Sequence, residues 1–337
     1  MSHAVPTILD VAAAAGVSKS VVSRALAGAY GVAPATVERV KQAARDLGYV
    51  ANANARGMSA HRTHTVGAFV RDASTPFYGH LLTAFQLRAA ERGYRVVTAT
   101  GAGSFSIAEE RRALETLVAL RVEGLIVCSG ALPVEDVLPF AQRIPTVVAG
   151  RPERDESVSS VYCDEHGGGT ALADRVADLG HERVAVFTVA RSGSLTQSAR
   201  TDAMARQLGA RGVDVVLVRL EDHGDDPRRL DSAVDHVVAV GGVTAIMAPS
   251  DHWAVGVLEA MRRRGLRAPE DLSVTGYDGI MPFATELFGI TSWRQPLDVI
   301  GSLSVDDVVD QIDGVTSRAT HTAIDGTLVP GRTLAPR

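Results

Sequence analysis

The sequence predicts a small all-α domain followed by an α/β body built from two doubly wound parallel-sheet lobes. Two observations support this prediction. The first fifty residues hold three short amphipathic helical patterns, and beyond residue 64 short β-rich runs alternate with helical stretches at nearly even spacing. The length of 337 residues exceeds that of a usual single domain, which fits a small module joined to a larger body.

The first predicted helix begins after Thr7, which is placed to cap it together with Asp10 three residues later. Gly16 is expected to end this helix, and Ser18 to cap a second one across a tight turn. Pro34 stands at a favoured first-turn position of a third helix. The apolar faces expected to form one small core are Ile8, Val11, Ala12 and Ala15, then Val21, Val22 and Ala25, then Val37, Val40, Ala44 and Leu47.

Two short helices across a glycine turn are typical of a helix-turn-helix, whose second helix enters the major groove of DNA. Lys19, Ser20 and Arg24 fall on the outer face of the second helix near its start. An arginine there is able to donate two hydrogen bonds to a guanine. On this pattern alone, a solvated helical face explains the same residues equally well.

Charge is distributed unevenly along the chain. Residues 1–64 hold seven basic and three acidic residues, which gives them a net charge of +4. Because the whole chain has a net charge of −5, the remaining residues have a net charge of −9. A basic head on an acidic body is what a polyanion-binding module joined to a sensor would show, although chance clustering remains open.

The body contains two series of strand patterns separated by about the length of a βαβ unit. Each series is expected to build an open parallel sheet with helices on both faces. The first series starts at residues 65, 95, 124 and 146 (TVGAFV, RVVTA, GLIVC and TVVAG), and the second at residues 183, 213, 243 and 272 (RVAVFTV, VDVVLV, VTAIMA and LSVTGY).

Ligands of open parallel sheets bind beyond the carboxyl ends of the strands. The side chains expected near those ends are carboxylates, planar donors and aromatics, a mixture that suits a polyhydroxylated, sugar-like ligand. Some of them have an alternative structural role, since Ser250 and Asp251 also suit a helix cap and Asp278 a turn. The candidates are Phe77, Tyr78, Arg151, Arg200, Ser250 with Asp251, Asp278, and Trp293 with Gln295.

Other classes of protein find little support. No apolar run approaches the roughly 20 residues that span a bilayer, and the first 17 residues lack the order of a secretory signal, so we expect a cytoplasmic protein. We expect Cys128 and Cys163 to be buried thiols, and we expect no metal, no cofactor and no catalytic residue. The main rival is a solute-binding protein of a transport system; a sugar-processing enzyme is a weaker third interpretation.

The string TILDVAAAAGVSKSVVSRAL, continued by RVKQAARDLGYVANANARGM, resembles the opening of the lactose-repressor/galactose-repressor (LacI/GalR) family of transcription regulators. The resemblance implies base reading in the major groove by the second helix. It also implies a hinge helix from Asn52 to Ala60 that enters the minor groove when two subunits pair on palindromic operator DNA, with Met58 as the wedge between base pairs and Ala55 allowing close approach. The implied DNA-binding residues are Ser18, Lys19, Ser20, Ser23, Arg24, Thr36, Tyr49, Asn52, Ala55 and Met58.

The resemblance continues to about Thr333 through STPFYGHLL, ARTDAMARQL, APSDHWAVGVLEAM, SVTGYDGI and SWRQP. It implies a periplasmic-binding-protein-like body and effector contacts at Arg151, Arg200, Ser250, Asp278 and Gln295. Gly150 stands where the family often has aspartate, Ser250 where it often has asparagine, and Ala33 where serine often caps the third helix. The family's extra tetramer-forming helix has no counterpart, so the resemblance implies a homodimer.

The domain organisation expected from these observations is a helix-turn-helix domain over 1–50, a hinge helix and linker over 51–63, and the two-lobed effector-binding and dimerisation domain over 64–337. The first lobe is expected to comprise about 64–161 and 292–321, and the second about 162–291 and 322–337. A ligand held between the lobes would favour one relative orientation of them and thereby change how the hinge helices pair on DNA. Release of a repressor by an inducer is the expected direction, with a corepressor left open.

Overall fold

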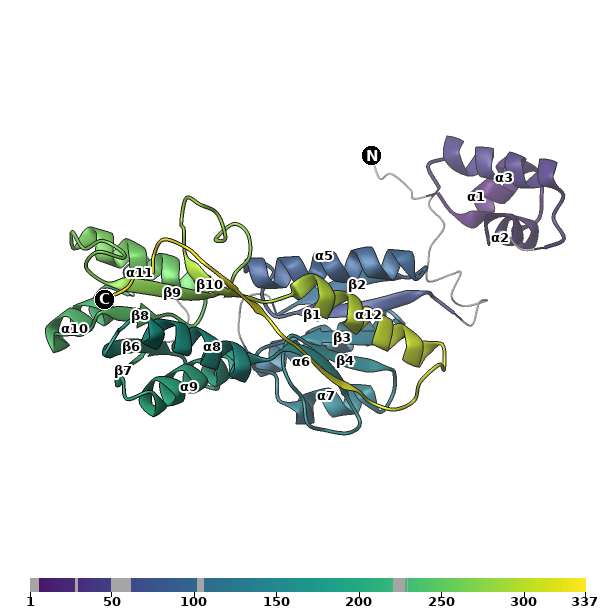
Figure 1. Cartoon of the computed structure of the whole chain (residues 1–337). Coiled ribbons are helices and arrows are strands. Elements are labelled where there is room, and N and C mark those ends of the chain that lie inside the picture. The colour runs from purple at the N-terminus through teal and green to yellow at the C-terminus, as the bar shows by residue number, and fades with distance from the viewer. Residues whose placement is uncertain (1–5, 28–29, 50–61, 102–105, 221–227, 229) are drawn as a thin grey trace. The chain divides into compact units, whose positions relative to one another are not determined.

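The computed structural model describes residues 6–27, 30–49, 62–101, 106–220, 228 and 230–337. These residues fall into two compact units, Met1–His64 and Thr65–Arg337. Figure 1 shows a small helical unit and a larger α/β unit. Each unit has its own hydrophobic core, so each is described separately.

The helical unit contains α1 (Ile8–Ala15), α2 (Lys19–Ala27) and α3 (Pro34–Asp46). The predicted capping box is confirmed, because the Thr7 side chain accepts from the Asp10 backbone while the Asp10 carboxylate accepts from the Thr7 backbone. Gly16 ends α1 in the left-handed conformation, with a φ of 64°, which glycine adopts without steric cost. Helix α3 starts at Ala33 without any side-chain cap. The buried core is Val11, Ala12, Ala15, Val22, Ala25, Val40, Ala43 and Ala44.

Two core predictions in this unit are wrong, since Val21 is half-buried and lies outside the core cluster and Leu47 is exposed. Leu47 is the C-cap residue of α3 and is 37% exposed, whereas Ala43 is buried in its place. The helix ends at Asp46, so the residue after it no longer follows the helical spacing on which the prediction depended.

The first lobe is a parallel six-stranded sheet in the order β11-β5-β4-β3-β1-β2. Its strands are β1 (Thr65–Val70), β2 (Arg95–Thr100), β3 (Gly124–Cys128), β4 (Thr146–Ala149), β5 (Ser159–Cys163) and β11 (His321–Ile324). The helices that accompany them are α5 (Pro76–Glu91), α6 (Ile107–Ala119), α7 (Val134–Ala141) and α12 (Leu297–Ile312).

Alternate residues of β1 face different cores. Val66 and Ala68 pack with Phe85 of α5 and Ile300 of α12, whereas Phe69 packs with α6 and α7. A strand buried on both faces has this period-two pattern, and it reads as one continuous apolar run. The sheet is therefore doubly wound, as predicted (Figure 1).

The second lobe repeats this arrangement with the strand order β12-β10-β9-β8-β6-β7. Only β12 runs antiparallel, paired with β10, among the strand pairs that the structure describes in this sheet. The strands are β6 (Arg183–Thr188), β7 (Asp214–Arg219), β8 (Ala245–Met247), β9 (Ser273–Asp278), β10 (Thr291–Arg294) and β12 (Thr327–Val329). The helices are α8 (Glu165–Asp178), α9 (Leu195–Ala210), α10 (Asp231–Val240) and α11 (Asp251–Arg263).

The chain crosses between the lobes three times. The crossings follow β5, which ends at Cys163, then β10, which ends at Arg294, and then β11, which ends at Ile324. These crossings lie two or three residues later than the expected segment bounds of 161, 291 and 321, because β5, β10 and β11 were not among the strand patterns recognised in the sequence.

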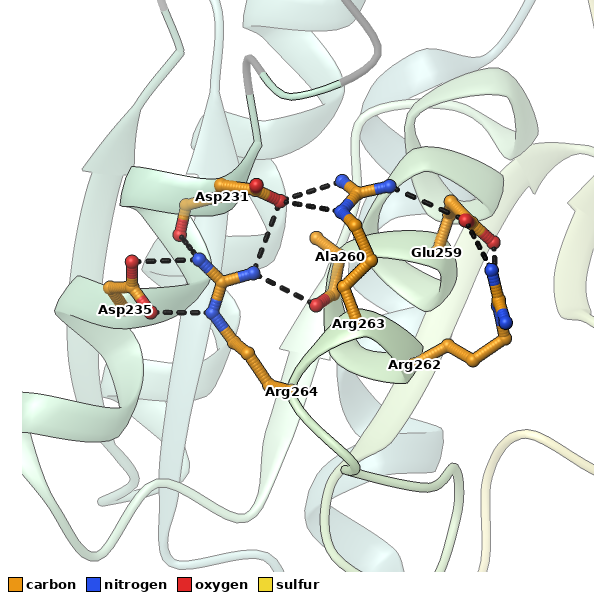
Figure 2. A network of polar contacts seen from close by, with 7 residues as sticks. All are labelled: Asp231, Asp235, Glu259, Ala260, Arg262, Arg263 and Arg264. Carbon is orange, nitrogen blue, oxygen red and sulfur yellow. Dashed lines mark hydrogen bonds and ion pairs between the residues drawn. The ribbon is translucent and has the colours of Figure 1, made fainter.

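Helices α10 and α11 are joined by a polar network at the end of α11 (Figure 2). Arg263 donates to Asp231 at 2.6 Å, and Arg264 donates to the Asp231 carboxylate at 3.1 Å and to its carbonyl oxygen at 2.7 Å. Arg264 also pairs with Asp235, and Arg262 with Glu259 of its own helix. Most of these groups are partly exposed, so the network orients α10 against α11 more than it stabilises the lobe.

Two further observations complete the fold. Cys128 and Cys163 are free and buried, as predicted, and burial raises the pKa of the Cys163 thiol to about 12. Among the described residues, none of the helices combines the length and apolarity needed to cross a bilayer.

Candidate functional site

Helix α2 presents its polar residues to solvent. Lys19, Ser20 and Arg24 are exposed, and the Arg24 Nε donates only a long 3.4 Å hydrogen bond to the Ser20 carbonyl oxygen. The Ser18 hydroxyl accepts from the Val21 backbone at 3.4 Å and so caps the start of the helix. The exposed start of this helix therefore carries side chains suited to base edges.

The other predicted DNA contacts have mixed surroundings. Ser23 and Thr36 are half-buried, and Tyr49 is half-buried against the core of the helical unit with its backbone N–H bound to the Ala44 carbonyl at 2.8 Å. The three hinge residues of the prediction, Asn52, Ala55 and Met58, lie outside the described residues.

In the second lobe, the predicted ligand residues gather around Arg200, a buried residue of α9. Its Nε lies 2.7 Å from Oε2 of Glu165, and its Nη2 donates to Oε1 of the same carboxylate at 2.8 Å. Its Nη1 donates to Asp278 at 3.0 Å and to the Pro249 carbonyl at 3.1 Å. The ring of Tyr277 lies under the guanidinium, 4.0 Å from its carbon to the centroid.

This cluster brings more negative than positive charge together. Glu165 and Asp278 face one arginine, and a third carboxylate, Asp251, lies close enough to interact with Asp278. Burial raises the pKa of Glu165 to about 7, although Arg200 opposes this shift. Burial and the nearby Asp278 carboxylate likewise raise the pKa of Asp251 to about 7.

Asp278 ends β9 with a φ of 108°, a conformation that non-glycine residues rarely adopt. The amide of Gln295 donates to the same Asp278 oxygen as Arg200, at 2.8 Å, and the Gln295 backbone N–H binds the Asp278 carbonyl at 2.9 Å. The Gln295 Oε1 is buried and accepts no hydrogen bond from the residues that the structure describes. A strained backbone residue and a buried acceptor therefore lie together past the carboxyl ends of β9 and β10.

Ser250 has the helix-capping role that the sequence left open for it, whereas Asp251 binds groups outside its own helix. Ser250 is the N-cap of α11, with its hydroxyl accepting from the Trp253 backbone at 3.5 Å. Asp251 accepts from the Ser292 hydroxyl at 2.6 Å and from the Gly279 backbone at 2.7 Å. Ser250 is therefore engaged by its own helix, and Asp251 ties α11 to β10 and to the turn after β9.

The first lobe holds the remaining predicted residues. Arg151 is buried, donates to the Leu132 carbonyl at 2.7 Å and pairs with Glu153 at 2.8 Å, whereas its Nε has no hydrogen-bond partner within the described part of the chain. Phe77 and Tyr78 form an edge-to-face pair 5.2 Å apart. A Cβ atom on Gly150 would lie 3.3 Å from the Phe77 ring, so this ring fills the space in which the family's aspartate would project.

Two residues depart from the sequence-based expectation. Trp293 lies inside β10 rather than past its end, and its indole nitrogen is buried, so it belongs to the core of the second lobe. Glu165 was not among the candidates, although it is the main partner of Arg200. It follows the unrecognised strand β5, and a search past the end of that strand would have found it.

The comparisons with known proteins agree with this geometry. Residues 7–52 match the family of bacterial regulatory proteins, lacI family, and residues 63–334 match the periplasmic binding proteins and sugar binding domain of LacI family. The chain is 33% identical to the HTH-type transcriptional regulator CelR of Thermobifida fusca, over 95% of this chain and 96% of that protein. The chain belongs to the LacI family.

Solved structures of LacI-family regulators share the fold. The chain is 29% identical to CelR in the structure of a transcriptional regulator CelR–cellobiose complex, with a TM-score of 0.67. The match covers 97% of this chain and 99% of the CelR chain. The Lac repressor dimer bound to operator and an anti-inducer has a TM-score of 0.82 at 23% identity, covering 98% of this chain and 99% of that one. The predicted family and fold class are confirmed, and the chain is a DNA-binding transcription regulator rather than a solute-binding protein of a transport system.

Proposed function

We propose that the chain represses transcription by binding palindromic double-stranded operator DNA as a homodimer in the bacterial cytoplasm. The observation that carries this proposal is the exposed start of α2, where Lys19, Ser20 and Arg24 face solvent. One such helix contacts too few base pairs for useful specificity, so two copies are required. The Lac repressor dimer on its operator supports this arrangement.

The proposed roles divide the head residues by chemistry. Lys19, Ser20 and Arg24 read base edges, whereas Ser18, Ser23, Thr36 and Tyr49 position the unit on the phosphate backbone. The hinge residues Asn52, Ala55 and Met58 enter the minor groove, with Met58 as the wedge that unstacks a base step.

We further propose that a small, sugar-like effector binds between the lobes, contacting the residues around Arg200 in the second lobe and Phe77, Tyr78 and Arg151 in the first. Asp278 and the unused Gln295 Oε1 supply acceptors, and the Arg151 Nε supplies a donor, a combination that suits vicinal hydroxyl groups. The cellobiose complex of CelR supports a carbohydrate effector. Gly150 and Ser250 stand where the family often has an aspartate and an asparagine that bind hydroxyl groups of the ligand. Phe77 fills the space beside Gly150, and the Ser250 hydroxyl caps its own helix. We therefore expect a ligand other than the usual monosaccharides.

The proposal assigns no catalytic step to this site. The carboxylates Glu165, Asp251 and Asp278 are held by arginine, hydroxyl and backbone donors, so none is poised as a free general base. Within the described residues, no group of three or more histidine, cysteine, aspartate or glutamate side chains is arranged to hold a metal ion.

The test is to select bound sites from random double-stranded DNA with the full chain. Enrichment of a palindrome supports the proposal, and genes beside matching genomic sites then suggest candidate effectors. Recovery of unenriched DNA, with or without cellobiose and other neutral sugars, contradicts it. An effector is identified when it changes the affinity for the selected palindrome, and lack of ligand turnover separates a regulator from a sugar-processing enzyme.

A further inference from the structure

A short segment of the second lobe, residues 193–195, contacts the first lobe directly. The Arg71 Nη1 donates to the Gly193 carbonyl at 2.5 Å, and the Leu195 backbone N–H donates to the Gly130 carbonyl at 2.7 Å. Arg71 follows the last residue of β1, and Gly130 lies two residues past β3. The two contacts therefore join the carboxyl edge of the first sheet to the start of α9 in the second lobe.

Arg71 is fixed within its own lobe by a buried ion pair. Its Nε lies 3.1 Å from Oε1 of Glu110 on α6, and the other oxygen of Glu110 accepts from the Ser129 hydroxyl at 2.6 Å. Arg71 is 5% exposed and Glu110 is 1% exposed. The pair with Glu110 fixes the guanidinium plane, and from that plane Nη1 donates to Gly193 of the second lobe.

The receiving segment leads into the helix that carries Arg200. Ser194 is the N-cap of α9, and its hydroxyl accepts from the Gln197 backbone at 3.3 Å. The Gln197 side chain in turn accepts from Trp253 of α11 at 3.2 Å. The start of α9 is therefore bonded both to Arg71 of the first lobe and, through Gln197, to α11 of the second lobe.

We propose that Arg71 is a positioning residue that holds the two lobes in the orientation seen here through its bond to Gly193. The latch consists of Arg71, Glu110, Gly130, Gly193 and Leu195. Separating the lobes would break the hydrogen bond from the buried Arg71 guanidinium to the Gly193 carbonyl. This bond is charge-assisted and therefore stronger than one between neutral groups. The latch thereby sets how readily the lobes change orientation, whichever effector binds.

Proximity across the latch can be measured with a pair of introduced cysteines. A Cβ atom placed on Gly130 would lie 3.9 Å from the Ser194 Cβ, close to the mean of about 3.8 Å for disulfides. The variant G130C/S194C therefore forms an intramolecular disulfide only when the lobes have the orientation seen here. The native Cys128 and Cys163 are buried, and the single variants G130C and S194C serve as controls for their reactivity.

The experiment measures the rate of this disulfide bond's formation in oxidised glutathione, by peptide mass mapping of the full chain. Arg71→Met is combined with Glu110→Gln, because removal of the arginine alone would leave a buried carboxylate unpaired. We expect the rate in this background to fall by about tenfold, as loss of one charge-assisted hydrogen bond implies. A urea titration confirms that the protein stays folded, so a slower rate reports lobe orientation.

Arg211→Leu is the matched control, since Arg211 bridges Asp174 and Asp178 within the second lobe and does not reach the first. Its cross-linking rate should equal that of the parent pair. The inference is overturned if the Arg71 background cross-links as fast as the parent, if the Arg211 background slows equally, or if the parent pair fails to cross-link. None of these measurements uses DNA or an effector, so their outcome is independent of the proposed function.

Discussion

Glu165 binds Arg200 through two nitrogens, with Nε 2.7 Å from one carboxylate oxygen and Nη2 donating to the other at 2.8 Å. Both residues are buried, so the pair replaces water as the partner of each charge. Because Arg200 is also bound to Asp278 and Pro249, the guanidinium acts first as the organiser of the second lobe's polar cluster and only then as a possible ligand donor.

The first prediction concerns this pair. Glu165→Ala should lower the free energy of unfolding by about 3–5 kcal/mol, because it leaves a buried arginine without its main partner. The measurement is urea denaturation. The matched control is Glu91→Ala, which removes a pair with Arg88 whose members are 33% and 64% exposed, and should cost about 0–1 kcal/mol. Equal losses of unfolding free energy in the two variants would show that the buried pair stabilises the fold no more than the exposed pair does.

The second prediction concerns pH. The folded pKa of Asp251 is about 7, above its ordinary value of 3.8, so the folded state binds this proton more tightly than the unfolded state. Its contribution to stability is fully present below pH 3.8 and is lost as the pH rises through 7. Unfolding free energies at pH 5 to 8 should therefore fall more steeply in the parent than in Asp251→Asn. Parallel pH curves for the two proteins would contradict this assignment.

The third prediction tests base reading by α2. Arg24→Ala should weaken binding to the selected palindrome by about 1–3 kcal/mol and relax specificity at one symmetric pair of positions. Arg45→Ala is the control, because Arg45 lies on α3 and donates to Gln42 at 2.6 Å. It should leave the base preference unchanged. A uniform loss of affinity for all sequences in Arg24→Ala would assign this residue to the phosphate backbone instead.

The fourth prediction concerns the replaced aspartate position. Gly150 has a φ of 81° and lies against Phe77, so Gly150→Asp should destabilise the body through both the left-handed backbone, by about 1–2 kcal/mol, and contact with the ring. Adding Phe77→Ala should relieve the second cost while keeping the first, as measured by urea denaturation. If the losses of the two single variants simply add in the double variant, the ring does not fill this space.

Several strands that the sequence predicted, such as β1, β3 and β4, are apolar runs buried on both faces, whereas the predicted strands β2 and β7 are partly exposed. Strand β5 escaped recognition since it reads Ser-Ser-Val-Tyr-Cys. Its Ser159 hydroxyl accepts from Gln311 at 3.1 Å and from the Thr320 backbone at 3.0 Å, partners about 150 residues or more away. No local pattern carries such information, and the same holds for the short strands β10, β11 and β12.

The candidate site was predictable to the extent that it follows recognised strand ends. Asp278 was found in this way, whereas Gln295 follows the unrecognised strand β10 and was supported by the family resemblance; their contact at 2.8 Å joins them in one cluster. Arg200 came forward through the family resemblance as well. Glu165 and Arg71 were not foreseen, because their importance depends on partners in α9 and in the other lobe that only the three-dimensional arrangement brings near.

The most direct test of the whole account compares the affinity of G130C/S194C for the selected palindrome before and after oxidation. If lobe orientation controls pairing on DNA, locking the lobes should change the dissociation constant by about 5- to 150-fold, the range typical of allosteric coupling, and reduction should reverse the change. Identical dissociation constants for the fully cross-linked and the reduced protein would contradict the claim that the two-lobed body governs DNA binding.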